Sequence, residues 1–143
     1  MSIGEFLYWG RNMSINELVG KTLTSIVRDE NEESLTFHTT DGERFLMFHI
    51  QDCCESVRIE DICGDLEDLI GSPILTAREN VSSNEDPEGE DEREEDWRES
   101  FTWTFYDLAT AKGAVTIRWY GESNGYYSER VTFTKMEDEG EDN

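Results

Sequence analysis

Residues 51–62 read QDCCESVRIEDI, and the rest of the chain is organised around this stretch. Its second half, Val57–Ile62, alternates apolar and polar residues, which predicts a β-strand with one buried face. The polar residues before that strand predict a bend. A comparable stretch, SNGYYSERV at 123–131, precedes the final apolar alternation of the chain. Each stretch closes one half of the sequence.

The two halves also match elsewhere. The motif Leu-Val-Gly at 18–20 corresponds to Leu-Ile-Gly at 69–71, and ESLTF at 33–37 corresponds to ESFTW at 99–103. These matches predict an internal duplication of a helix-plus-strands unit. We therefore expect an α+β fold that is mainly antiparallel β, with six to eight strands and two short helices.

Local signals place the individual elements. Ser14 and Glu17 form a capping box for a short helix that Gly20 would end, and a second short helix is expected between Gly64 and Gly71. Asp41-Gly42 is a strong hairpin signal. Alternating apolar and β-branched residues predict strands at 21–28, 34–40, 44–51, 57–62, 72–81, 99–108, 114–120 and 126–135.

The chain length of 143 residues fits one domain over residues 1–143. Residues 1–13 are apolar without clear periodicity and are expected to form an N-terminal arm. Residues 82–98 are dense in acidic side chains and are expected to be a disordered insert. Residues 136–143 are expected to be a disordered acidic tail, because neither segment can bury enough apolar surface to offset the entropy lost on ordering.

The chain carries 34 acidic and 12 basic residues, a formal net charge of −22. Such a charge repels nucleic acids and anionic membranes and attracts a protein partner with a basic surface. We expect no direct nucleic-acid binding and no membrane span, since no apolar run approaches the roughly 20 residues required. Without a signal peptide at the start, the expected location is cytoplasmic. A homodimer is left open.

The three cysteines, Cys53, Cys54 and Cys63, are expected to be free thiols. Cys53 and Cys54 are adjacent, so on a strand they would face opposite sides, with one thiol toward the core. Zinc sites usually space cysteines by two to four residues and use four ligands, so we expect no metal and no cofactor. The alternative is a small-molecule or metal-binding module centred on Asp52, Cys53, Cys54 and Glu55.

Aromatic residues flank the turn in the second closing stretch. By alternation, half of them should face away from the core, where aromatic side chains favour contact with a partner. Cross-strand aromatic packing is the alternative. The predicted partner-binding residues combine these aromatics with nearby acidic and polar groups: Asp52, Glu55, Tyr120, Glu122, Asn124, Tyr126 and Tyr127.

Three sequence stretches resemble a small domain family of tailed phages and prophages that has no assigned activity. They are QDCCESVRIEDICGDLEDLIGSPI at 51–74, ESFTWTFYDLAT at 99–110 and RWYGESNGYYSE at 118–129. The resemblance implies a cytoplasmic, non-enzymatic accessory protein. Together with the net charge, the resemblance predicts an inhibitor or modulator of a host protein, such as a nucleic-acid-binding defence or replication factor. The inhibitor would present a phosphate-like negative surface to that host protein. A self-associating structural protein is a further alternative.

Overall fold

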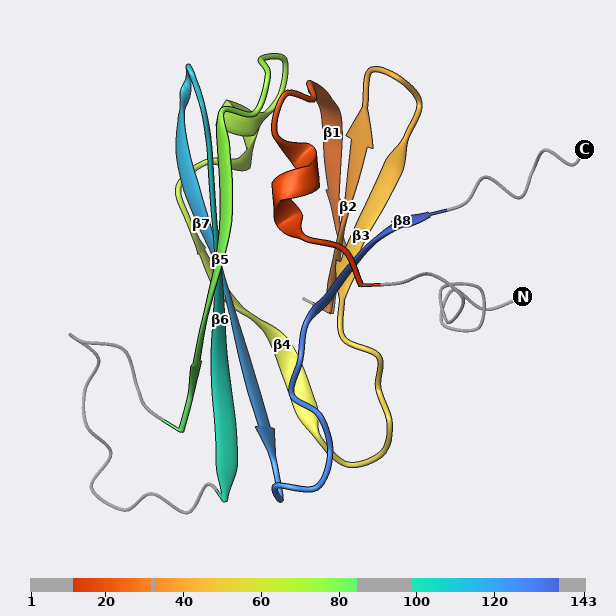
Figure 1. Cartoon of the computed structure of the whole chain (residues 1–143), viewed down its shortest axis with the longest axis vertical. Helices are drawn as coiled ribbons and strands as arrows, with labels where there is room; N and C mark the ends of the chain where they lie inside the picture. The colour runs from red at the N-terminus through yellow and green to blue at the C-terminus, as the bar shows by residue number, and fades with distance from the viewer. Residues whose placement is uncertain (1–11, 32, 85–98, 137–143) are drawn as a thin grey trace, which may run out of the picture.

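Two four-stranded antiparallel sheets pack face to face in a computed structural model, which describes residues 12–31, 33–84 and 99–136 (Figure 1). In spatial order, the first sheet contains β1 (Leu23–Arg28), β2 (Ser34–Thr39), β3 (Arg44–Phe48) and β8 (Thr132–Met136). The second sheet contains β4 (Ser56–Cys63), β7 (Gly113–Ser123), β6 (Ser100–Thr110) and β5 (Thr76–Ser83).

The prediction of an α+β fold with two short helices is wrong. The helical segments of the described residues are two four-residue 3₁₀ turns, η1 (Ile15–Leu18) and η2 (Leu66–Leu69). Each turn has only one pair of apolar residues three positions apart, and a single such pair can anchor one turn of 3₁₀ helix but not an amphipathic α-helix. The Ser14 hydroxyl accepts a hydrogen bond from the Asn16 amide rather than from the third residue of the turn.

The order of elements is the same in the two halves of the chain: one 3₁₀ turn followed by four strands. The fourth strand of each half, however, pairs with the third strand of the other half. β4 pairs with β7, and β8 pairs with β3. Two equivalent hydrogen bonds tie the halves together near the turns, from the Gly20 amide to the Ile74 carbonyl at 2.8 Å and from the Gly71 amide to the Leu23 carbonyl at 3.0 Å.

The core lies between the sheets and is lined by the alternating inward residues of both. Trp119 of β7 and Met47 of β3 meet at its centre, where the indole N–H lies 3.2 Å from the Met47 sulfur. Phe45 and Phe133 stack with ring centroids 5.5 Å apart. Burying one such side chain contributes roughly 1.5–3 kcal/mol, so this shared core holds the exchanged strands in place.

A second aromatic cluster lies on the opposite face of the second sheet. Phe101, Trp103 and Tyr120 are buried there, and the Arg118 guanidinium lies 5.0 Å from the Trp103 ring centroid. Phe101 and Trp103 therefore share a face, as their alternation indicates, but that face is not the one that lines the central core.

Three predicted strands extend too far. The strand predicted at 44–51 ends at Phe48, the strand predicted at 126–135 begins at Thr132, and the strand predicted at 72–81 begins at Thr76. In the segments that follow β3 and precede β8, side-chain hydrogen bonds replace strand pairing. The insert expected at 82–98 and the tail expected at 136–143 each begin too early, because Ser82 and Ser83 belong to β5 and Met136 belongs to β8. The rest of both segments, 85–98 and 137–143, and residues 1–11 of the expected N-terminal arm lie outside the described residues. Among the residues that are described, no helix has the length and apolar character needed to cross a membrane.

Candidate functional site

Two loops carry the chain from one sheet to the other at the same end of the sandwich, the lower end in Figure 1. The first crossover loop, residues 49–55, joins β3 to β4, and the second crossover loop, residues 124–131, joins β7 to β8. They contain most of the predicted partner-binding residues. A hydrogen bond of 2.7 Å between the His49 ring Nδ1 and the Arg130 carbonyl links them.

The Glu55 carboxylate holds the first crossover loop from inside. Its Oε2 accepts hydrogen bonds from the Asp52 amide at 2.8 Å and from His49 Nε2 at 2.7 Å, and its Oε1 accepts one from the Cys53 amide at 3.0 Å. Burial alone would raise the pKa of this carboxyl, but these hydrogen bonds outweigh it and lower the pKa to about 2. Glu55 is therefore an ionised structural anchor.

His49 connects the two loops through both of its ring nitrogens. Its two ring nitrogens face the Glu55 carboxylate and the Arg130 carbonyl, and neither group can donate a hydrogen bond in return. Both contacts are buried, since the side chains of His49 and Glu55 are 4% and 0% exposed.

Glu129 plays the corresponding part in the second crossover loop. Its carboxylate accepts hydrogen bonds from the Thr102 hydroxyl at 2.6 Å and from the Ser123 hydroxyl at 2.5 Å. The chain packs closely beside it: a Cβ placed on Gly121 would lie 3.0 Å from a methyl group of Val57 and 3.1 Å from the Glu129 Cβ. A small residue is therefore needed at position 121.

Tyr126 is the most exposed aromatic side chain of this end, with 82% of its surface accessible. The Tyr127 ring packs edge to face against it, with centroids 5.0 Å apart. The turn below is held by hydrogen bonds from the Gly125 amide to the Ser123 hydroxyl and from the Tyr126 amide to the Asn124 side chain. An exposed ring on a backbone held in this way loses little entropy when it binds.

The remaining predicted partner-binding residues are placed differently from one another. Asp52 and Asn124 are exposed, and Glu122 is half-buried. Tyr120 is only 5% exposed and donates a hydrogen bond to Glu122 at 2.8 Å. Glu55 is 4% exposed, so it and Tyr120 can support a binding surface but do not form one. Whether the exposed members bind a partner stays a prediction.

Sequence reasoning missed His49, Glu129 and Arg130 as members of this end of the molecule. A signal for one of them was present: Glu55-x-Val57-x-Ile59 and Glu129-x-Val131-x-Phe133 have the same spacing before an inward strand. In both loops the glutamate side chain satisfies hydrogen-bond donors of its own connection. The partners of Arg130 depend on how the sheets pack, which the spacing does not indicate.

The expectation about Cys53 and Cys54 is wrong in two respects. A disulfide joins them, and both residues are exposed, so neither sulfur atom faces the core. They lie in a bend rather than on a strand, which removes the reason for expecting their side chains to point to opposite sides. Cys63 is a free, exposed thiol at the end of β4. In the described part of the chain, no three His, Cys, Asp or Glu side chains are placed to hold a metal ion.

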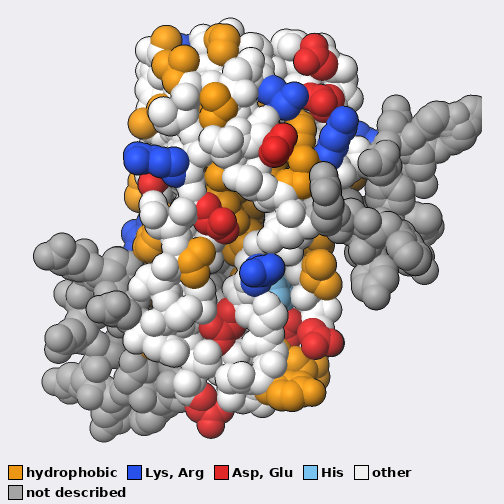
Figure 2. Space-filling view, in the orientation of Figure 1, with side chains coloured by type: hydrophobic (Ala, Val, Ile, Leu, Met, Phe, Trp, Pro, Cys, Tyr) orange, Lys and Arg blue, Asp and Glu red, His pale blue; other side chains and the backbone are white. Residues whose placement is uncertain are grey.

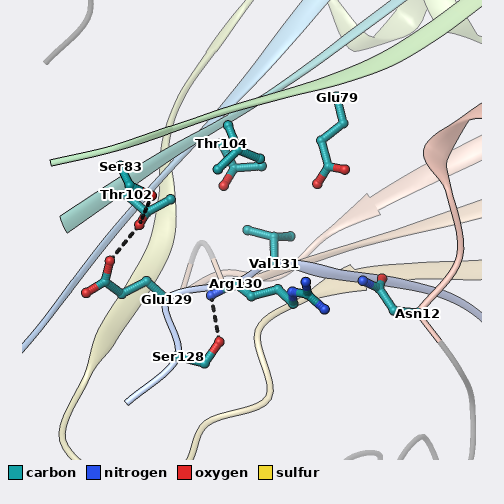
Figure 3. A pocket seen from close by; sticks show the side chains of 10 residues that line it. Asn12, Glu79, Ser83, Thr102, Thr104, Ser128, Glu129, Arg130 and Val131 are labelled. Carbon is teal, nitrogen blue, oxygen red and sulfur yellow. Dashed lines mark hydrogen bonds between the residues drawn. The ribbon is translucent and has the colours of Figure 1, made fainter. Parts of the chain in front are cut away.

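A pocket of about 320 Å³ lies beside the second crossover loop, between the inward face of β5 and β6 and the segment Ser128–Val131 (Figure 3). We call it the Arg130 pocket. Glu79, Thr104 and Arg130 point into it from different elements. Besides these three, its lining is completed by Asn12, Val81, Ser83, Thr102, Ser128, Glu129 and Val131.

The described residues carry a net negative charge, with acidic and basic side chains interspersed. They hold 18 acidic and 9 basic residues, a formal net charge of −9. Figure 2 shows the Lys and Arg side chains of one face scattered singly among neutral and acidic groups. Several basic side chains form ion pairs with carboxylates; Lys21 and Lys135, for example, both contact Glu43. That face offers no basic patch of the kind that binds phosphate backbones.

The fold and this end of the molecule define an antiparallel β-sandwich with exchanged fourth strands and two carboxylate-anchored crossover loops. Residues 16–133 match the model of DUF7448, a domain of unknown function, and the chain belongs to that family. No curated protein and no solved structure matches the chain.

Proposed function

We propose that this protein is a binding protein that modulates a protein partner through the second crossover loop, with Tyr126 as the central contact. The observation that carries the proposal is the 82% exposure of Tyr126 on a loop held in place by side-chain hydrogen bonds. Tyrosine is enriched among the residues that dominate binding energy at interfaces.

Charge supports the choice of partner. The whole chain has a net charge of −22, and the described residues alone have −9. A negative surface speeds association with a basic protein and slows association with nucleic acid. The proposed partner is therefore a protein whose basic surface serves nucleic acid binding, such as a host defence or replication factor. This setting follows the resemblance to phage-encoded domains.

No catalytic role is part of the proposal. The buried carboxylates of Glu55 and Glu129 are engaged by donors of their own loops, so the residues that most resemble acid–base groups serve the fold. The same engagement of Glu55 gives the module centred on Asp52, Cys53, Cys54 and Glu55 less support than the Tyr126 surface receives.

The test compares the wild-type protein with the variants Tyr126→Ser and Leu75→Ser. Leu75 is 58% exposed and is not part of either crossover loop, so its substitution is a matched control. Each protein is immobilised and exposed to host lysate, bound proteins are identified by mass spectrometry, and the affinity of a purified candidate is then measured by calorimetry. We expect a basic partner that Leu75→Ser retains and that Tyr126→Ser binds at least about tenfold more weakly.

Two results would contradict this proposal. Equal affinity of Tyr126→Ser and the wild type would remove Tyr126 from the interface. A concentration-dependent dimer that Tyr126→Ser abolishes, measured by light scattering, would instead assign the tyrosine surface to self-association.

A further inference from the structure

The Arg130 pocket contains opposite charges that do not neutralise each other. Glu79 reaches it from β5 and Arg130 from the second crossover loop, on opposite walls (Figure 3). Among the described residues, the ion pairs within 4.0 Å include none between the Arg130 guanidinium and a carboxylate. Two opposed charges separated by a cavity can each bind one end of a ligand.

The acidic side of the pocket has a free acceptor. Tyr106 donates a hydrogen bond to Glu79 Oε2 at 3.0 Å, which leaves Oε1 for the cavity. Burial and the neighbouring Glu79 charge raise the pKa of Tyr106 far above its ordinary value. The phenol therefore stays neutral and keeps donating, so the Glu79 carboxylate is fixed in direction and presents one oxygen to the pocket.

The basic side of the pocket has additional donors. The Asn12 Oδ1 accepts a hydrogen bond from the Phe133 amide at 3.0 Å, so its NH₂ group is left for the cavity beside Arg130. Thr104 is only 3% exposed, and its hydroxyl points into the pocket.

From this arrangement we infer that the Arg130 pocket binds a small zwitterion that carries a carboxylate and an ammonium group, such as a free amino acid. The carboxylate would contact Arg130 and Asn12, and the ammonium group would contact Glu79. The volume of about 320 Å³ is at the lower end of the roughly 300–1,000 Å³ typical of ligand sites, which fits an amino acid better than a nucleotide.

Electrostatics favour a zwitterion over the simpler ligands. A pure anion would meet Glu79 and Glu129 as well as the negative charge of the whole domain. A pure cation would be attracted by the two carboxylates but would make no favourable contact with Arg130. A zwitterion adds no net charge and matches both walls. The inference is independent of the proposed protein partner, because the pocket lies between the sheets rather than on the exposed tyrosines.

The test titrates the full-length protein with glycine, L-serine and L-glutamate, and separately with acetate and ethylamine as the two isolated halves of a zwitterion. Binding is followed by amide chemical-shift changes and by calorimetry. We expect saturable binding of at least one amino acid, with shifts at Thr104 and Arg130, and no saturable binding of acetate or ethylamine.

Variants separate the two walls. Arg130→Gln and Glu79→Gln should each weaken amino acid binding by at least about tenfold, since each removes one charged contact. Arg78→Gln is the matched control, because Arg78 neighbours Glu79 on β5 but is exposed and does not line the pocket. It should bind as the wild type does.

Three results would overturn the inference: no saturable binding of any amino acid to the wild type, acetate or ethylamine binding as tightly as the amino acids, or Arg130→Gln binding as tightly as the wild type. The wild-type titration and Arg130→Gln decide the question even if Glu79→Gln fails to fold after losing the charge beside Tyr106.

Discussion

Replacing Glu55 by Gln removes the charge that holds the first crossover loop while keeping the shape of the side chain. The carboxylate accepts hydrogen bonds from two backbone amides and from His49, and its side chain is fully buried. A glutamine can accept with one oxygen only, and its NH₂ group would face a donor. The His49 ring would also lose its contact with a charged carboxylate.

The pKa of Glu55 gives the size of the effect. A fall from an ordinary value of 4.5 to about 2 corresponds to roughly 3 kcal/mol of differential stabilisation of the charged form at about 1.4 kcal/mol per unit. After relaxation of the loop we expect Glu55→Gln to lower the free energy of unfolding by about 2–3 kcal/mol at neutral pH. For a chain of this size the melting temperature should fall by about 6–12 °C.

The pH dependence has a definite sign. Because the pKa of Glu55 is lower in the folded state than in the unfolded state, its contribution is complete above about pH 4.5 and is lost as the pH falls toward 2. Urea unfolding of the wild type and Glu55→Gln should therefore show a gap at about pH 7 that shrinks to less than half at about pH 3.

The control for this experiment is Glu60→Gln. Glu60 lies on β4 and contacts Arg58 at 3.1 Å, but both side chains are substantially exposed. Its substitution should change the free energy of unfolding by less than about 1 kcal/mol. A Glu55→Gln effect as small as that of Glu60→Gln, or one of the same size at both pH values, would refute the assignment of Glu55 as an ionised anchor.

Three further predictions follow from packing, exposure and charge. Gly121→Ala should destabilise the protein by about 1–3 kcal/mol in urea unfolding, because the added Cβ would press on Val57 and Glu129; unchanged stability would contradict the close approach. Replacing both Cys53 and Cys54 by Ser should cost about 1 kcal/mol or less, since both are exposed and their disulfide spans adjacent residues; a larger loss would contradict this exposed placement. Gel-shift assays at physiological salt should show no binding of DNA or RNA, given the net charge of −22, whereas micromolar retention of either would contradict this.

Some elements of the fold are encoded by local sequence patterns, and others depend on tertiary packing. The strand β6 (Ser100–Thr110) was predicted within two residues at its C-terminal end and one at its start, because eleven alternating residues signal a strand strongly. The helix predicted at Ser14 failed because a capping signal describes how a helix begins, not how long it is. The helix predicted between Gly64 and Gly71 failed because two glycines limit a segment without making it helical. Residues 126–131 of the second crossover loop were predicted as part of a strand because Tyr126, Tyr127 and Val131 favour strands by composition alone.

The sequence by itself determined that the chain is strongly acidic and mainly antiparallel β, with two halves that share one order of strands, since periodicity, turn residues and charge are local properties. Only the tertiary structure decided that the fourth strands change sheets, because β4 and β8 could satisfy their backbone donors against either neighbour. The exchange is favoured by the shared core, where Met47 of one half meets Trp119 of the other. The same packing brings Glu79 and Arg130, 51 positions apart, to opposite walls of one pocket, a juxtaposition that no local pattern of the chain encodes.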